Sequence, residues 1–361
     1  MKNTLFIFLL LFIITNSVIS QEMDFESYNP PSTLVVPEHI VTKAKFPFID
    51  VHNHQRLNNR DLSGLVNEMN DLNMKVMINL SGKRGGIQGL QDGLKNVKEN
   101  YPNRFITFTN IDFSNIDDHN WSQNAAKILE ADVKAGANGL KIFKSLGLRH
   151  SDKNGNRIAV DDPRIDAVWA KCGELGIPVL IHAADPKPFW SPHDDQNERW
   201  LELKVRSGRK RSDTDPAPWE TIIAEQHNVF RKHPNTKFIN AHLGWFGNNL
   251  DKLSELMDTY PNMYSEIGAV IAELGRQPRR AKAFLTKYQD RVMFGKDSYR
   301  KEEYYTYFRV LETNDEYFPY YKKYHAYWKM YGLDLSDEVL RKLYYKNALN
   351  VIPNIDKSIF P

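Results

Sequence analysis

Two histidines, His52 and His54, stand one residue apart in the segment FIDVHNHQ. Because side chains alternate across a β-strand, residues two apart point to the same side, as two imidazoles must to bind one metal ion. Alone, this pair is common by chance. Three more residues of ligand type end other apolar runs: His182 in IPVLIH, His242 in FINAH and Asp297 after VMFG. Together they predict a metal centre built from several strand ends.

Imidazole and carboxylate donors define the chemistry that such a centre would support. Neutral imidazoles with one carboxylate suit zinc, and the same donors also accept manganese or iron. An open position on the ion leaves room for a water molecule whose pKa falls to about 7. Asp297 can both touch the ion and take a proton from that water, as a general base does. If the five residues were only structural, each strand end would bury a polar group that needs its own partner, which is costly.

This ordered set of residues resembles the amidohydrolase superfamily, in particular the amidohydrolase-related branch that includes the aminocarboxymuconate-semialdehyde decarboxylases. The resemblance runs from IDVHNH to the segment KNALNVI, which is similar to the family's closing G-N-A segment with Lys346 in place of glycine. It implies that a divalent ion is bound by His52, His54, His182 and Asp297. It also implies that His242 either binds a second ion or serves in acid–base catalysis and substrate polarisation.

Two lysines in the run GLKIFK bear on the number of ions. By the same resemblance, this run matches the place where some superfamily members carry a carboxylated lysine that bridges two metals. Lys141 fits that position better, because it follows an apolar stretch, whereas Lys144, the last residue of the run, lies just past the apolar part of the strand and faces the mouth of the fold. An ordinary role for both lysines stays open. We favour one ion and keep Lys141 as a second-site ligand or substrate contact.

Basic residues also follow several of the apolar runs. Arginine pairs hold carboxylates and other anions, so this ring predicts a small substrate with an anionic group. Ordinary solvated charge is the alternative, because the chain has 48 basic residues in all. The substrate-binding candidates taken from the ring are Arg56, Arg84 and Arg300, with Lys144 beside them.

Two other segments are unusual in length or composition. The stretch from Pro186 to Pro218 follows the fifth apolar run and has the length of a lid loop; its His193 is a candidate substrate contact. The stretch from Tyr304 to Tyr331 is rich in aromatic residues, which could stack on a substrate ring but more often pack on the rest of the fold or on a second copy of the chain. A homo-oligomer is therefore left open.

Short apolar runs alternate with helix-period segments along the chain, and this order favours a parallel α/β fold. Eight such units most simply close into a (β/α)₈ TIM barrel, whose active site lies at the C-terminal ends of the strands. An open doubly wound sheet is the alternative, but no G-x-G-x-x-G follows the first run. The predicted strands are Phe46 to His54, Met74 to Leu80, Phe105 to Phe113, Gly139 to Lys144, Pro178 to Ala184, Lys237 to Gly244, Met263 to Ala269 and Val292 to Ser298.

The N-terminus predicts export. Lys2 precedes an apolar run from Leu5 to Ile14, and small residues follow near Ser20, as in a signal peptide. The run is shorter than the roughly 20 residues that span a bilayer, so we expect cleavage near Ser20 rather than a stable membrane anchor. The expected organisation is a signal peptide over residues 1–20, a lead segment over 21–45 and a barrel domain over 46–361. The single cysteine, Cys172, excludes an intrachain disulfide.

Charge and composition narrow the classes of function. The chain has 361 residues and a formal net charge of +3, without the basic excess expected of a nucleic-acid binder. The first hypothesis is hydrolysis of an amide, ester or lactone, in which Asp297 passes a proton to the leaving group and His242 stabilises the oxyanion. Non-oxidative decarboxylation, known from the branch that the sequence resembles, is the second. A silent barrel that only binds a ligand is the third.

Overall fold

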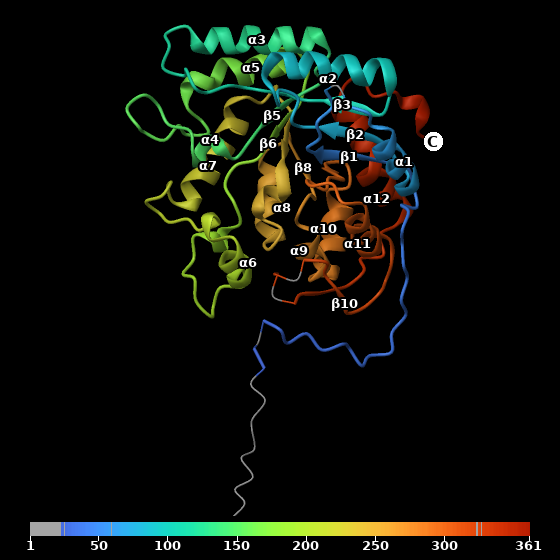
Figure 1. The fold of residues 1–361 in the computed structure, drawn as a ribbon. Coiled ribbons are helices and arrows are strands. Elements are labelled where there is room, and N and C mark those ends of the chain that lie inside the picture. Colours follow the sequence, from blue (N-terminus) through green and yellow to red (C-terminus); the bar gives the residue numbers. More distant parts are fainter. Residues whose placement is uncertain (1–22, 25, 59, 323, 326) are drawn as a thin grey trace, which may run out of the picture. The chain divides into compact units, whose positions relative to one another are not determined.

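The computed structural model describes residues 23–24, 26–58, 60–322, 324–325 and 327–361 (Figure 1). It divides into two compact units, Met1–Val35 and Val36–Pro361. The predicted signal peptide lies outside the described residues, and the described part of the first unit has no helix or strand. Residues 36–45, which we assigned to the lead segment, belong to the second unit. Among the described residues no helix is long and apolar enough to cross a membrane.

Parallel strands at the centre of the second unit match the eight predicted runs, each strand lying within its run. Nearly all of their residues are buried, as in sheets covered on both faces. The third run is interrupted at Phe108, so β3 pairs with β2 and β4 pairs with β5. The strands are β1 (Phe48–Asn53), β2 (Met74–Asn79), β3 (Phe105–Thr107), β4 (Thr109–Asn110), β5 (Leu140–Ile142), β6 (Val179–Ile181), β7 (Phe238–Asn240), β8 (Met263–Glu266) and β9 (Val292–Met293).

Backbone hydrogen bonds close these strands into a ring. From β4 to β9 each strand pairs with the next one in the chain, and β1, β2 and β3 do the same. The last strand returns to the first: the Val51 N–H donates to the carbonyl of Phe294 over 3.0 Å, and the Asp297 N–H donates to the carbonyl of His52 over 2.7 Å. The predicted (β/α)₈ barrel is confirmed, and its C-terminal edge carries the predicted site residues.

Helices cover the outside of this ring (Figure 1). In α8, for example, Leu250, Leu253, Leu256 and Met257 recur at helical spacing and form one buried stripe, while Asn249 caps the first turn through the Lys252 N–H. The helices are α1 (Ser63–Leu72), α2 (Gly86–Asn100), α3 (Trp121–Ala135), α4 (Ser145–Leu148), α5 (Asp166–Glu174), α6 (Trp200–Val205), α7 (Trp219–Lys232), α8 (Leu250–Thr259), α9 (Ile271–Gly275), α10 (Pro278–Lys287), α11 (Lys301–Glu312), α12 (Asp337–Arg341) and α13 (Asn347–Val351).

Two long segments lie at the same end of this unit, where Figure 1 shows α6 and β10. They are residues 186–218, which include α6, and residues 317–331, which form an antiparallel pair from β10 (Phe318–Pro319) and β11 (Lys329–Met330). We call the two segments the roof. The predicted aromatic stretch from Tyr304 to Tyr331 begins in α11 and ends in the second roof segment. Its first part packs on the barrel, because Tyr304 and Tyr307 of α11 are fully buried.

The buried side chain of Arg199 joins the two roof segments. Its guanidinium is ion-paired with Glu202 of α6 over 2.9 Å and with Glu273 of α9. The same group lies 3.2 Å from His325 Nδ1 and 5.0 Å from the ring of Trp328, both in the second segment. An arginine with these contacts holds the roof on the barrel because its charge is neutralised only in this arrangement.

Candidate metal centre

The predicted site residues lie where strands end. His52 is the second-to-last residue of β1, His54 follows that strand, His182 follows β6, and His242 follows β7. Asp297 comes after β9, and the hydrogen bond of its N–H to His52 fixes it beside the first strand. His242 and Asp297 have positive φ angles of 58° and 84°, which non-glycine residues adopt at a cost of roughly 1–3 kcal/mol and mostly at functional sites.

Three side-chain atoms form a compact triangle at the barrel mouth. His52 Nε2 and His54 Nε2 are 3.3 Å apart, and Asp297 Oδ1 lies 3.5 Å from the first and 3.6 Å from the second. The point equidistant from the corners of such a triangle lies about 2.0 Å from each atom, which is the length of a zinc–nitrogen or zinc–oxygen bond. The three residues therefore fit one divalent ion. The Asp297 side chain is 36% exposed, so the triangle is open on the side of the cavity.

Partners on the far side of each ring direct both Nε2 atoms to this point. His52 Nδ1 lies 2.9 Å from Glu266 Oε1, and His54 Nδ1 lies 2.8 Å from Ser81 Oγ. With the carboxylate as acceptor, His52 carries its proton on Nδ1 and keeps the Nε2 lone pair for a metal. Such second contacts fix the tautomer and the ring orientation of metal-binding histidines.

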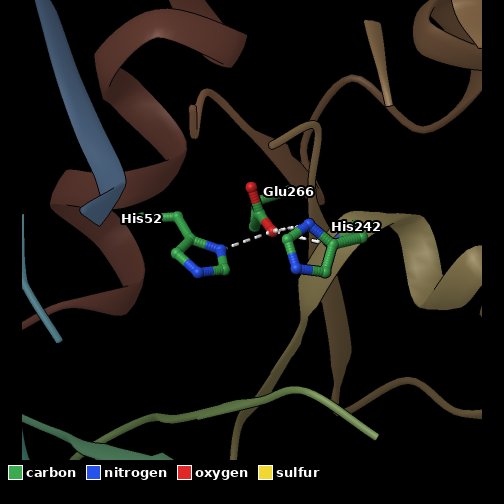
Figure 2. A group of neighbouring side chains, drawn as sticks. All are labelled: His52, His242 and Glu266. Carbon is green, nitrogen blue, oxygen red and sulfur yellow. Dashed lines mark hydrogen bonds and ion pairs between the residues drawn. The ribbon is translucent and has the colours of Figure 1, made fainter. Parts of the chain in front are cut away.

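Glu266, at the end of β8, is a site residue that sequence reasoning missed. Its carboxylate is buried and accepts the N–H groups of His242 over 2.7 Å and Gly268 over 2.6 Å besides facing His52 (Figure 2). Gly295 makes room for it, since a Cβ there would lie 2.1 Å from Glu266 Oε2. The signal in the sequence was an acidic residue inside a predicted buried strand, MYSEIGA, which needs a partner.

His52, His242 and Glu266 form a second cluster of potential ligands, drawn in Figure 2. Its donors are already engaged. Glu266 Oε1 accepts from the backbone of His242 and faces His52 Nδ1, while His242 Nδ1 lies 2.7 Å from the carbonyl of Gly268 and must donate its proton there. This cluster therefore orients the first triangle rather than holding an ion of its own.

His182 lies beside His242 and outside both ligand clusters. Its Nδ1 is 3.3 Å from His242 Nε2, and its buried Nε2 has no hydrogen-bond partner among the described residues. The ring of Trp245 stacks on His242 with centroids 4.5 Å apart. The structure thus brings three of the four expected ligands to one point and leaves the fourth next to the expected acid–base residue.

Electrostatics keeps the ligands in the protonation states that a metal needs. Burial is the main cause that holds the pKa values of His52 and His182 well below that of free histidine, and it lowers the pKa of His54 to about 4. Burial alone would raise the pKa of Asp297, but the neighbouring histidines outweigh it and keep this pKa below its ordinary value. At neutral pH the site therefore offers neutral imidazoles and a carboxylate.

Lys141 and Lys144 take different positions. Lys141 is buried in β5, its Nζ has no hydrogen-bond partner among the described residues, and burial lowers its pKa to about 7. Its charge acts on His52 and His54, so it lies near the centre. Lys144 is ion-paired with Asp185 at the edge of the cavity. Of the two lysines, Lys141 is the one with an amine available beside the metal triangle.

A cavity of about 680 Å³ opens above the centre, between the barrel and the roof. His182, His242 and Asp297 line its floor, and Arg300 is on its wall. The other predicted substrate contacts lie elsewhere. Arg56 and Arg84 line a separate hollow of about 10 Å³. His193 is outside the cavity lining, with its ring stacked on Trp200 and its Nε2 2.9 Å from the Trp200 carbonyl.

The fold and the site define a parallel α/β-barrel protein with histidines and a carboxylate at its strand ends that could hold a metal ion. The amidohydrolase family model matches residues 98–353, which include His182, His242, Glu266 and Asp297. The chain belongs to the amidohydrolase family, and it is a metal-dependent enzyme of the amidohydrolase superfamily. The matched range begins after β1, so the H-x-H strand is not part of it. No curated protein sequence matches the chain.

Solved structures with the same fold have low sequence identity. A Staphylococcus aureus protein assigned as an amidohydrolase is 15% identical, with 85% of this chain and 100% of that chain covered and a TM-score of 0.53. An uncharacterised TIM-barrel protein from Bordetella bronchiseptica is 15% identical, with 84% and 98% covered and the same score of 0.53. At these identities the likeness supports the barrel fold alone.

Proposed function

We propose that this protein hydrolyses an amide, ester or lactone bond of a small substrate, with one divalent ion held by His52, His54 and Asp297. The triangle of Nε2, Nε2 and Oδ1 atoms carries the proposal, because its dimensions match metal–ligand bonds. We favour zinc, since nitrogen and oxygen donors at these distances suit it. The N-terminal sequence supports export of the enzyme as a further proposal.

A bound divalent ion supplies two things at such a site, polarisation of a carbonyl and acidification of water. The chain supplies the proton transfers. The Asp297 carboxylate stays ionised and lies at the floor of the cavity, where it can accept the proton of an attacking water. His182, whose buried Nε2 is without a partner, is proposed as an additional ligand or as a contact for the attacked carbonyl.

The tautomer of His242 determines what this residue can do. Because Nδ1 must donate to the Gly268 carbonyl, the neutral ring presents an unprotonated Nε2 at the cavity floor, 3.3 Å from His182 Nδ1. The ring can therefore take up a proton and return it to a leaving group, as a general acid–base residue does. Stabilisation of an oxyanion, the role expected from the sequence, would follow once Nε2 is protonated.

Decarboxylation is the second candidate, and the fixed tautomer of His242 favours it too. A protonated Nε2 can deliver its proton to the carbon that loses carbon dioxide, so the same residues serve both reactions. The barrel alone does not choose between them, because specificity depends on the loops around the mouth.

A substrate screen tests the proposal and separates the two reactions. Zinc-loaded protein is given lactones, esters, amides and carboxylated aromatics, with acid release and carbon dioxide release measured in parallel. We expect acid release, and we expect Asp297→Asn and His242→Gln to lower kcat by about a hundredfold or more. His193→Gln is the matched control and should keep the wild-type rate. Carbon dioxide release without hydrolysis would replace the first candidate by the second, and equal rates in all variants would exclude both.

A further inference from the structure

The cavity wall carries more basic than acidic side chains, and most of the basic ones are neutralised within the wall. Lys144 is paired with Asp185, Arg209 with Glu202 over 2.5 Å, and Arg199 with two glutamates. Such paired cations hold the roof in place. They have little attraction left for an anion from outside, because their charge is already compensated.

Lys322, in the second roof segment, lines the same cavity but differs from these paired cations in its contacts. Among the described residues its ammonium group forms no ion pair, because Glu303 is paired with Lys296 instead. The ammonium lies 5.7 Å from the centre of the Tyr321 ring. The side chain is partly buried, and burial lowers its pKa. Three carboxylates of the cavity lining act on it electrostatically, Glu303 most and then Asp297 and Glu202, so the ammonium faces the cavity that holds the candidate metal centre.

The segment around Lys322 is anchored on both sides. Before it, Tyr320 is buried and lies against Tyr321 with ring centroids 4.5 Å apart. After it, His325 is buried against Arg199. Described residues before and after Lys322 are thus packed, and Lys322 itself lines the cavity.

We propose that Lys322 forms an anion-binding subsite, with Arg206 at the rim, which takes a carboxylate or phosphate group of the substrate while the scissile bond lies at the metal centre. Arg206 also lines the cavity, is exposed, and has no carboxylate in ion-pair distance among the described residues. The proposal rests on the proposed function for the position of the scissile bond. It names the substrate class as a small molecule with an anionic group at the end remote from the reacting carbonyl.

Dicarboxylates test this subsite without knowledge of the substrate. Succinate, glutarate and adipate would be titrated calorimetrically into zinc-loaded and metal-free protein, beside butyrate as the monocarboxylate and 4-phosphonobutyrate as the phosphorus analogue. The variants are Lys322→Met and Lys322→Arg. The matched control is Lys329→Met, since Lys329 lies in the same roof segment over the Tyr317 ring and outside the cavity lining.

We expect the best dianion to bind zinc-loaded wild type about tenfold more tightly than Lys322→Met, which is the typical effect of one charged hydrogen bond. Lys322→Arg and Lys329→Met should stay close to wild type. Tighter binding of the phosphonate than of any dicarboxylate would identify a phosphate group as the ligand. In the metal-free state both proteins should bind the dianion more weakly, and wild type should still bind it more tightly than Lys322→Met.

Equal dianion binding by wild type and Lys322→Met, in both metal states, would overturn the subsite. If the protein bound no metal, and wild type still bound dianions more tightly than Lys322→Met, the proposed function would be refuted and the subsite would stand. The two failures are therefore distinguishable. Melting temperatures of the variants, measured alongside, identify any loss that comes from unfolding, and retained binding by Lys322→Arg shows that charge rather than packing is responsible.

Discussion

Glu266 determines which nitrogen of His52 is available to a metal. Its carboxylate holds the Nδ1 side of the ring at 2.9 Å and is itself held by two backbone N–H groups. Without this acceptor, the proton could move to Nε2 and block the ligand position. Such partners of metal-binding histidines fix the ring orientation and raise the basicity of the ligand nitrogen.

We predict that Glu266→Gln weakens zinc binding by about 10- to 100-fold, the usual effect of losing such a partner. The amide keeps the size of the side chain but can turn its NH₂ towards His52 Nδ1. Competition with a fluorescent chelator measures the affinity. The control is Glu255→Gln, an exposed residue paired with Lys252. Unchanged zinc affinity in Glu266→Gln would show that the tautomer of His52 is fixed by something else.

At this scale the sequence predicted residue positions better than residue contacts. The H-x-H spacing and the strand-end positions placed His52, His54 and Asp297 together because strand geometry is local and regular. Glu266 was missed, since a single acidic residue in an apolar run has no spacing that marks it. Arg56 and Arg84 follow strands as predicted and still line a different hollow, because the direction of a loop side chain depends on contacts far along the chain.

In the roof, Arg199 forms two buried ion pairs, one with Glu202 and one with Glu273 of α9. Arg199→Met would leave Glu202 and Glu273 buried with less compensation, so we predict a loss of about 3–5 kcal/mol in the free energy of unfolding. Urea denaturation measures it. A triple variant, Arg199→Met with Glu202→Gln and Glu273→Gln, should recover part of the loss because no buried carboxylate remains uncompensated. Arg209, which loses Glu202 as its partner, has a side chain that is 43% exposed and stays solvated. If Arg199→Met alone were as stable as wild type, water would already reach the ion pairs of Arg199.

Helix α7 carries a histidine that should make the protein acid-sensitive. His227 packs among the rings of Phe230, Phe246 and Tyr260, and burial lowers its pKa to about 4 from an ordinary 6.5. As the pH falls below 6.5, His227 is therefore protonated in the unfolded chain before it is protonated in the folded protein. Stability contributed by the neutral ring is complete above pH 6.5 and is lost between pH 6.5 and 4.

We predict that the free energy of unfolding falls less in His227→Phe than in wild type when the pH is lowered from 7 to 4.5. The difference between the two falls should be about 2 kcal/mol in the metal-free protein. Urea denaturation at the two pH values gives the difference. His119→Phe is the comparison, since the side chain of His119 is exposed. Parallel losses in wild type and His227→Phe would show that the native ring is protonated as easily as in the unfolded chain.

The strands of the barrel could be predicted because each is a short apolar run between helical segments, and eight of them have one simple closed arrangement. Their exact ends could not. The predicted third run from Phe105 to Phe113 is split at Phe108, where the chain changes partner from β2 to β5. The roof was also beyond prediction, because Arg199 and His325 meet across 126 positions of sequence.

For the whole molecule, the barrel fold and the metal site are coupled through β1 and β9. One of the two hydrogen bonds that close the ring joins the backbones of His52 and Asp297, and the side chains of the same two residues form two corners of the triangle. An ion bound there stabilises the folded barrel relative to the unfolded chain. Zinc at a hundred times its dissociation constant should add about 2.7 kcal/mol to the free energy of unfolding. Wild type should show this gain in thermal melts, and Asp297→Asn should show much less.

The metal content of purified protein, measured by plasma mass spectrometry, tests the central claim most directly. We predict about one divalent ion per chain after zinc reconstitution and dialysis, and almost none in the double variant His52→Ala, His54→Ala. Two ions per chain would bring the amine of Lys141 into the site as a second-site ligand. No bound metal in wild type after reconstitution, or equal metal in the double variant, would contradict the account.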